Sequence, residues 1–254
     1  MCLIVFAIGV HPRYPFILAG NRDEFYERPA KPAFIWDTKP EIIAGKDEKA
    51  GGTWLGVSAQ GRFAALTNFR DMRQIKENAP SRGYIVRDIL TSPKSVPDFL
   101  DKLKKTAQDY NGFNLIAGTT DSLYYFSSIR NEYHNIIPGI YSISNAFMGT
   151  SWPKTDRTEK AFKKIIQADT IENEELFNML QHQKTYPNEK LPDTGLPDSL
   201  EKAVSAVFIK TENYGTRCST LVMADRHSKI NFEERSYTPG SDTVFHTARY
   251  NLTV

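Results

Sequence analysis

The sequence predicts a single α+β domain that spans residues 1–254 and contains two β-sheets. Two observations support this prediction. A chain of 254 residues with 40% hydrophobic content is long and apolar enough to form one substantial core. Along the chain, strand-like patterns come first, helical patterns follow and strand-like patterns return, without an internal repeat or a low-complexity linker. This order indicates two sheets.

Five strands are predicted before the first helix. Short apolar or β-branched runs broken by Gly, Pro and Asn are typical of strands in a sheet, and here they cover residues 2–9, 15–20, 41–45, 53–58 and 62–69. Two helices are predicted next, because Ser81 and Ser95 are suitable N-cap residues. The first helix runs to Thr91, and the second has an apolar face made of Val96, Phe99, Leu100 and Leu103.

The second half of the chain predicts further strands around two amphipathic helices. The helices are expected at residues 155–168 and 173–182, where apolar residues recur at helical spacing. Prolines and a glycine in the stretch 184–200 predict a long surface loop at an edge of the site. The strands expected in this half lie at residues 113–117, 122–127, 140–144, 217–224 and 229–236.

Charge and composition exclude several classes of partner. The 32 Lys and Arg residues against 30 Asp and Glu leave a net charge of +2 without a basic run, so neither nucleic acid nor an anionic membrane is expected as a partner. The apolar start is too short to span a bilayer and lacks the features of a signal peptide, so we expect a cytoplasmic protein. With only Cys2 and Cys218, neither a disulfide framework nor a zinc site is expected.

Cys2 is the residue with the most direct chemical interpretation. Methionine aminopeptidases remove Met1 when the second residue is small, which would leave Cys2 with a free α-amino group. A thiol has an ordinary pKa of about 8.5 and an α-amino group one of about 7.7 to 8, so the amine can accept the thiol proton. Alternatively, Cys2 is a buried cysteine, because it opens an apolar run that is typical of a core strand.

The tetrapeptide Asn21-Arg22-Asp23-Glu24 follows an apolar strand directly, which marks a strand end that faces solvent or a site. One interpretation is a charged turn in which Arg22 and Asp23 pair with each other. The other starts from the needs of an N-terminal nucleophile. A carboxylate such as Asp23 would hold the α-amino group, and a cation such as Arg22 or Arg217 would lower the pKa of the thiol.

Three further segments could complete such a site. Asn68 and Asn145 each follow a predicted strand, where the side-chain amide can donate to an oxyanion or form a turn. In the strand that begins near residue 214, alternation places Arg217 and Ser219 on one face and Cys218, interpreted as a core residue, on the other.

Together these segments resemble the NRDE-motif, or transport and Golgi organisation protein, family. The resemblance extends from residue 2 to about residue 224. It is carried by several motifs in order, namely Cys2, Asn21-Arg22-Asp23-Glu24-Phe25, Gly51-Gly52-Thr53-Trp54-Leu55-Gly56, Ala65-Leu66-Thr67-Asn68-Phe69, Ser81-Arg82-Gly83, Leu191-Pro192-Asp193-Thr194-Gly195 and Tyr214-Gly215-Thr216-Arg217.

The resemblance implies a four-layer α-β-β-α sandwich of the N-terminal-nucleophile hydrolase type. A roughly similar motif order occurs in cysteine-type acylases that cleave penicillin V and conjugated bile salts. The resemblance implies that Cys2 is both nucleophile and base, and that Arg22 and Asp23 tune Cys2 and hold it in place. It also implies that Asn68 and Asn145 are oxyanion and orienting groups and that Arg217 is a further polar support.

One departure from those acylases concerns the adjacent pair Arg22 and Asp23. In the acylases the corresponding Arg and Asp are separated by intervening residues. Adjacent residues of an extended backbone point to opposite sides. Only one of the two side chains is therefore expected to face Cys2.

Two classes of function follow. The first is an amidohydrolase that cleaves the non-peptide C–N bond of a small linear amide. The second is a non-catalytic carrier or chaperone that holds haem, an acyl-CoA or a lipid in the same cleft, since the resemblance also implies haem trafficking and lipid homeostasis. Haem would then be a carried ligand, and no cofactor is expected to be required. The 12 Tyr and 15 Phe residues could line such a cleft or fill the core.

Overall fold

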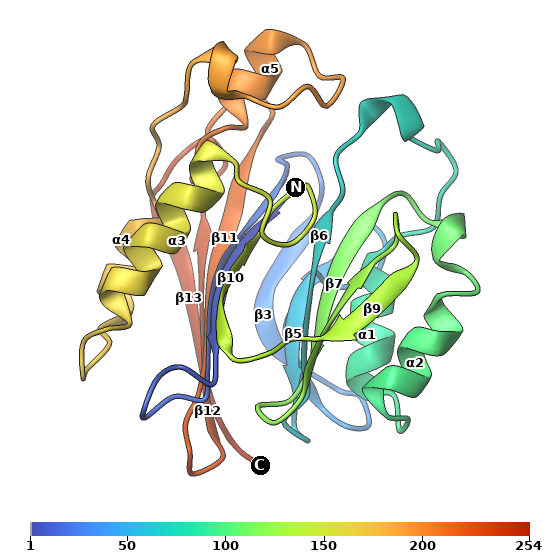
Figure 1. The fold of residues 1–254 in the computed structure, drawn as a ribbon, viewed down its shortest axis with the longest axis vertical. Helices are drawn as coiled ribbons and strands as arrows, with labels where there is room; N and C mark the ends of the chain where they lie inside the picture. Colours follow the sequence, from blue (N-terminus) through green and yellow to red (C-terminus); the bar gives the residue numbers. More distant parts are fainter. Residues whose placement is uncertain (1) are drawn as a thin grey trace.

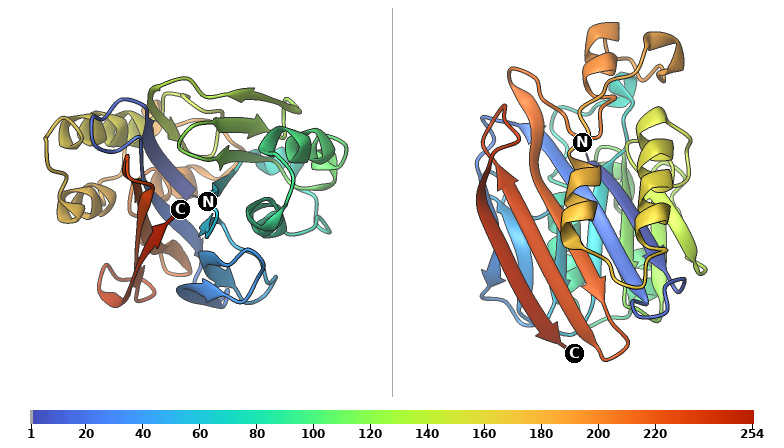
Figure 2. Two further views of the ribbon diagram at one scale, coloured as in Figure 1. Left: turned by 90° about the horizontal axis from the view of Figure 1, so that it is seen from below. Right: turned by 90° about the vertical axis from the view of Figure 1, so that its left-hand side faces the viewer.

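Two antiparallel sheets pack face to face in the computed structural model, which describes residues 2–254 (Figure 1). One sheet has six strands in the order β10-β1-β2-β11-β12-β13, and the other has seven in the order β3-β4-β5-β6-β7-β8-β9. Helices cover the outer face of each sheet, as the two views of Figure 2 show. The predicted α-β-β-α order of layers is therefore confirmed.

The six-stranded sheet contains the start of the described chain. Strand β1 lies between β10 and β2 and pairs antiparallel with both. Its residues Ile4 and Phe6 join the core between the sheets, whereas Val5 and Ala7 pack beneath helices. The same alternation turns Cys2 towards the other sheet. The strands of this sheet are β1 (Cys2–Ile8), β2 (Phe16–Phe25), β10 (Gly139–Ile143), β11 (Tyr214–Ala224), β12 (Lys229–Tyr237) and β13 (Val244–Thr253).

The seven-stranded sheet is covered by α1 (Gly83–Thr91) and α2 (Val96–Leu103). Helix α1 buries four apolar residues, namely Ile85, Val86, Ile89 and Leu90. The strands of this sheet are β3 (Ala30–Trp36), β4 (Ile42–Asp47), β5 (Leu55–Ser58), β6 (Phe63–Asn68), β7 (Phe113–Gly118), β8 (Leu123–Ser127) and β9 (Glu132–Asn135).

Helices α3 (Pro153–Ile165) and α4 (Asn173–Leu180) cover the six-stranded sheet through Phe162, Phe177 and other buried residues. Helix α5 (Asp198–Ala203) lies above the end of the sheets at which the chain begins (Figure 1). Three short 3₁₀-helices complete the described elements, namely η1 (Met72–Gln74), η2 (Ala107–Asp109) and η3 (Asn188–Lys190).

The structure adds three strands that the sequence does not predict, β3, β9 and β13, and each lies at the edge of its sheet. Pro32 interrupts β3 at a register shift between Lys31 and Phe34, and β9 is mostly exposed. Edge strands need little apolar alternation, so their sequences give a weak strand signal. The expectation that the chain finishes on a strand at 229–236 is therefore wrong. The predicted 184–200 loop is also interrupted, by η3 and the start of α5.

The two predicted helix starts have different outcomes. Ser95 caps α2 by accepting a hydrogen bond from the backbone nitrogen of Asp98 at 3.2 Å, as predicted. Ser81 is not the N-cap of α1, because the helix begins at Gly83 and Arg82 occupies the capping position. The Ser81 hydroxyl instead accepts a bond from the Gly83 nitrogen.

Candidate active site

Cys2 lies at the end of β1, where three neighbouring strands place chemically active side chains on one face. Cys2 is directly opposite Arg22 of β2, and Arg22 is directly opposite Cys218 of β11. Directly opposed residues of antiparallel strands share a face. The two buried thiols therefore flank one guanidinium group on the face that meets the other sheet. Cys218 is part of the core, as predicted, and it also lines a cavity.

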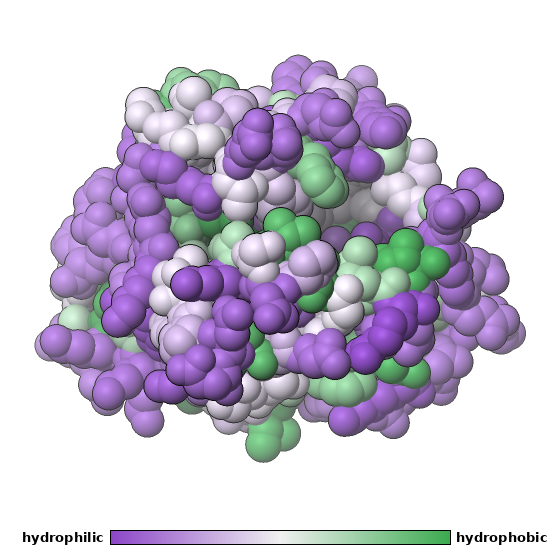
Figure 3. All heavy atoms as spheres, turned by 90° about the horizontal axis from the view of Figure 1, so that it is seen from above, coloured by the Kyte–Doolittle hydropathy of each residue, from purple (hydrophilic) through white to green (hydrophobic). Residues whose placement is uncertain are grey.

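A cavity of about 610 Å³ opens between the ends of the two sheets. Its lining includes Cys2, Arg22 and Asp23 from the six-stranded sheet and Asn68 from the seven-stranded sheet. Exposed apolar side chains also line it, which gives the cavity a polar part and an apolar part. The view from above shows hydrophobic residues around the hollow on this face (Figure 3). These apolar residues are Phe25, Met72, Ile75, Leu200 and Phe245.

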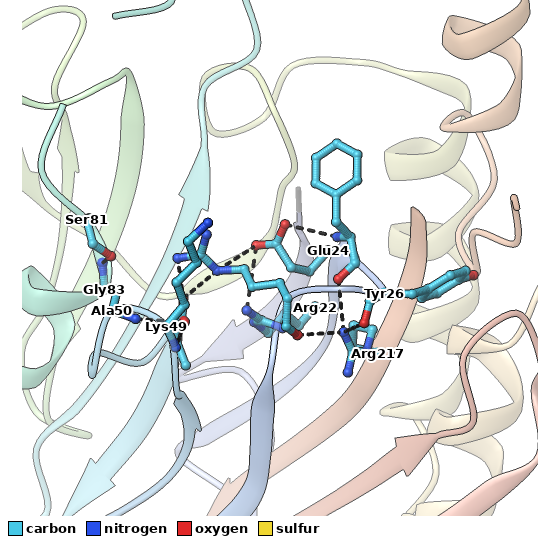
Figure 4. Close-up of polar contacts among 11 residues, drawn as sticks. Arg22, Glu24, Tyr26, Lys49, Ala50, Ser81, Gly83 and Arg217 are labelled. Atoms are coloured by element: carbon cyan, nitrogen blue, oxygen red, sulfur yellow. Dashed lines mark hydrogen bonds and ion pairs between the residues drawn. The ribbon is translucent and has the colours of Figure 1, made fainter. Parts of the chain in front are cut away.

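Arg22 belongs to a chain of alternating charges along the cavity wall (Figure 4). Its Nη2 lies 3.6 Å from Glu24, Glu24 lies 3.8 Å from Arg28, and Arg28 lies 2.7 Å from Asp47. The other terminal nitrogen of Arg22, Nη1, is buried and has no hydrogen-bond partner among the described residues. That nitrogen is available to a ligand atom.

Burial raises the pKa of the Cys2 thiol, although the charge of Arg22 acts in the opposite direction. The expectation that Arg22 or Arg217 lowers this pKa overall is therefore wrong. Desolvation penalises a thiolate more than a single guanidinium, shared here with Glu24, can compensate. The predicted removal of Met1 concerns a residue outside the described part of the chain.

Asp23 is fully buried next to the thiol, and its backbone N–H forms a hydrogen bond that favours the Cys2 thiolate. Its carboxylate accepts a hydrogen bond from the Thr216 hydroxyl at 2.7 Å. Burial raises the pKa of Asp23, while Lys154, Thr216 and Arg22 act against that rise. Between the adjacent residues, Arg22 is the one whose side chain shares the face of Cys2.

Asn68 and Asn145 meet at the junction of the two sheets. A side-chain N–H of Asn145 donates to the backbone carbonyl of Asn68 at 3.0 Å, and Asn145 is fully buried. Ser144 beside it donates to the backbone carbonyl of Cys2 at 3.2 Å. Asn68 thus lies in the cavity wall, and Asn145 is hydrogen-bonded to the backbone of Asn68.

Arg217 lines the same cavity as Cys2, and its hydrogen bonds go to the turn after β2. It occupies a β-bulge of β11, and its Nη1 donates to the backbone carbonyls of Phe25, Tyr26 and Arg28 at 3.0, 3.2 and 3.0 Å (Figure 4). These bonds hold the turn after β2, which forms part of the cavity wall. Arg217 therefore gives its polar support to the turn after β2.

Sequence reasoning missed several charged residues close to the site. Arg70 and Glu201 form a buried ion pair of 3.0 Å, and Lys154, at the start of α3, donates to the carbonyl of Val204 at 3.1 Å. Nothing in the local sequence distinguishes Lys154 from the other lysines of an amphipathic helix. Tyr214, by contrast, belongs to a motif identified above, and it lines the cavity. The predicted position of the 184–200 loop at the site is confirmed, since Leu196 and Leu200 also line the cavity.

Two structural findings on residues 2–254 concern metal ions and membranes. In that range, no group of three or more His, Cys, Asp or Glu side chains could hold a metal ion. Within the same range, every helix is too short or too polar to cross a bilayer.

Comparison with known proteins identifies the family. The family model described as Transport and Golgi organisation 2 matches residues 1–239. The chain belongs to this family. Relatives in the Transport and Golgi organisation 2 family include a mouse homologue, 34% identical over 276 residues that cover 100% of this chain and 99% of the relative. A human homologue is 33% identical with the same coverage, and a Drosophila melanogaster relative is 27% identical over 94% of this chain and 93% of its own.

Solved structures show that this member of the Transport and Golgi organisation 2 family has the N-terminal-nucleophile hydrolase fold. A mutant of conjugated bile acid hydrolase from Clostridium perfringens aligns with a TM-score of 0.53 over 98% of this chain and 96% of that chain. A second variant of that hydrolase gives a TM-score of 0.54 over 96% and 92%. Both share only 9% sequence identity with this chain, so the likeness concerns the fold.

Proposed function

We propose that this protein is a cysteine-type amidohydrolase that cleaves the non-peptide C–N bond of a small linear amide. The observation that supports the proposal is the position of Cys2 at the wall of a cavity of about 610 Å³, beside Arg22 and Asp23. The fold is shared with a conjugated bile acid hydrolase, whose name describes hydrolysis of a conjugated small molecule. A cavity of this size accommodates a small-molecule substrate.

The proposed reaction uses both ends of Cys2 after removal of Met1. The α-amino group takes the thiol proton, and the thiolate attacks the amide carbon to form a tetrahedral intermediate. The free Nη1 of Arg22 and the amide of Asn68 are the donors available to the oxyanion. Collapse transfers the proton to the leaving nitrogen, releases the amine and leaves a thioester on Cys2. Water then attacks the thioester carbon, which restores the thiol and releases the carboxylic acid.

The test compares wild type with Cys2→Ala on a panel of N-acyl amides. Loss of a covalent nucleophile typically reduces the rate by about 10³-fold or more, and we expect that loss here. Intact-mass spectrometry of the wild type should show that Met1 is absent and should detect the acyl thioester. Equal rates in both proteins, or a retained methionine in a protein that still hydrolyses the amides, would reject the mechanism.

The exposed apolar residues in the cavity lining favour a second candidate, a carrier of haem, an acyl-CoA or another lipid. Phe25, Met72, Ile75, Leu200 and Phe245 would bury the apolar part of such a ligand. Among the described residues, the cavity lining contains no His, but it includes side chains of three other types that ligate haem iron, namely Cys2, Cys218, Met72, Tyr214 and Tyr237.

The carrier is tested by titrating the protein with haem and with a long-chain acyl-CoA. We expect binding at a Kd on the order of micromolar. A purely apolar carrier should lose about 1 kcal/mol of binding free energy or less in Cys2→Ala. Abolished haem binding in that variant would indicate ligation by the thiolate. Absence of binding to the wild type would reject the carrier.

A further inference from the structure

A buried polar network joins the seven-stranded sheet to the segment that follows β10 of the other sheet. Asn114 of β7 is 1% exposed, and both N–H groups and the oxygen of its side-chain amide are hydrogen-bonded. Its Nδ2 donates to the backbone carbonyl of Ala146 at 2.8 Å and to the Thr67 hydroxyl at 3.2 Å. Its Oδ1 accepts from the Tyr125 hydroxyl at 2.7 Å, and the Tyr125 oxygen accepts from the backbone nitrogen of Met148 at 3.2 Å.

The same segment holds the two residues that the proposed reaction brings together, Cys2 and Asn68. Ser144 donates to the backbone carbonyl of Cys2 at 3.2 Å. Asn145 bonds twice to the chain around the end of β6. Its side chain donates to the Asn68 carbonyl at 3.0 Å, and its carbonyl accepts from the Arg70 nitrogen at 2.8 Å. Because Cys2 belongs to the six-stranded sheet and Asn68 to the seven-stranded sheet, the segment is a hydrogen-bonded link between them.

We infer that Asn114, oriented by Tyr125, is a positioning residue of the candidate active site. Residues 144–148 lie outside the helices and strands, so side chains hold backbone groups that have no strand partner. An amide donor stabilises an oxyanion only at a defined distance, and a misplacement of about 1 Å can cost about 10²-fold in rate. The inference rests on the proposed function, because it takes Asn68 as the oxyanion donor for a group that Cys2 attacks.

Tyr125→Phe is the main test variant, because it keeps the buried ring and removes the hydroxyl that bonds to Asn114 and Met148. The measurement is acylation of Cys2 by p-nitrophenyl acetate. The thiolate attacks the ester carbonyl, p-nitrophenolate leaves and a thioester remains, so an oxyanion forms without amide hydrolysis. The rate that persists in Cys2→Ala is subtracted. We expect Tyr125→Phe to lower the remaining rate about tenfold, and Asn114→Leu, which removes all bonds of the amide, to lower it further.

A double-mutant cycle with Asn68→Ala separates positioning from a general loss of structure. In the Asn68→Ala background the donor is already absent, so Tyr125→Phe should change the rate by less than about twofold. A merely structural role of Tyr125 would lower the rate by the same factor in both backgrounds. Equal factors, or a wild-type rate in Tyr125→Phe, would overturn the inference.

Tyr133→Phe is the matched control, since Tyr133 lies on β9 beside β8 and its hydroxyl donates to Asp101 of α2 at 3.2 Å. It should leave the acylation rate unchanged, and an equal loss in this variant would overturn the inference. Amide hydrolysis is measured in the same proteins. The expected coupling without amide hydrolysis would retain the role of Asn114 and reject the amidohydrolase. Amide hydrolysis without that coupling would retain the enzyme and overturn the positioning role.

Discussion

At the scale of single residues, burial opposes the charged forms of the groups around the cavity. Burial raises the pKa of Cys2, of Asp23 and of Glu234. Glu234 on β12 accepts hydrogen bonds from the backbone nitrogen of Ala33 at 2.7 Å and from the Thr220 hydroxyl at 3.2 Å, so it joins the two sheets. Such groups make the stability of the fold depend on pH.

Glu234→Gln should change how the free energy of unfolding varies with pH. A carboxyl group whose pKa is raised in the folded state binds its proton more tightly there, so wild-type stability falls as the pH rises from the ordinary pKa of 4.5 through the raised value. The substitution removes this fall. Its stability relative to wild type should increase with pH by about 1.4 kcal/mol for each unit by which folding raises the pKa.

Urea denaturation of wild type and Glu234→Gln at about pH 4.5 and pH 8 measures this difference. Glu77→Gln, at an exposed position, is the control substitution. A constant difference for Glu234→Gln would show that Glu234 does not contribute to the pH dependence.

At the scale of elements, the strands with apolar sequences could be predicted, whereas irregular strands and contacts distant in sequence could not. Residues 2–8 read as a core strand because apolar side chains fill both faces of β1. The bulge at Arg217 adds one residue to β11 and interrupts the alternation that the sequence predicts, in which Arg217 and Ser219 share one face. Helix α1 begins at Gly83, which makes a close backbone contact with Gly52, a residue distant in sequence, and the Thr53 nitrogen donates to the Gly83 carbonyl at 3.1 Å.

Gly52→Ala should destabilise this contact more than substitution of its neighbour. A Cβ on Gly52 would lie 2.4 Å from the Gly83 carbonyl carbon, and backbone atoms cannot move aside as a flexible side chain can. We expect a loss of about 2–3 kcal/mol. At Gly51, with φ of +75° and no atom within 4 Å of an added Cβ, the cost should be about 1 kcal/mol. Urea midpoints for both variants test the order, and an equal loss would contradict the close approach.

At the scale of the whole molecule, the site lies where polar contacts connect the two sheets and the segment that contains α5. The motif residues Cys2, Arg22, Asp23 and Asn68 could be assigned to one site from the sequence, because each lies at or near the end of a predicted strand and belongs to a motif that carries the family resemblance. Lys154 could not be assigned to it. Its position beside the cavity-lining Val204 depends on packing between segments that lie far apart in the sequence, which local patterns do not describe.

The segment around α5 should be held over the site mainly by the buried pair of Arg70 and Glu201. Both side chains are at most 6% exposed, so Glu201→Gln removes the carboxylate of a buried ion pair and leaves the Arg70 charge buried. Glu201→Gln should therefore cost about 3–5 kcal/mol. Arg73 and Asp193 join the same two segments at 3.7 Å but are 61% and 85% exposed, which makes Asp193→Asn a matched control with an expected cost below about 1 kcal/mol.

Hydrogen exchange locates the consequence of each substitution. Backbone amides of residues 184–205 should exchange faster in Glu201→Gln than in wild type or Asp193→Asn, while amides of β1 should change less. The double variant Arg70→Met with Glu201→Gln should lose less stability than the sum of its single variants, because no buried charge of that pair then remains. Additive losses, or equal exchange in Glu201→Gln and Asp193→Asn, would show that the buried pair does not hold the α5 segment over the cavity.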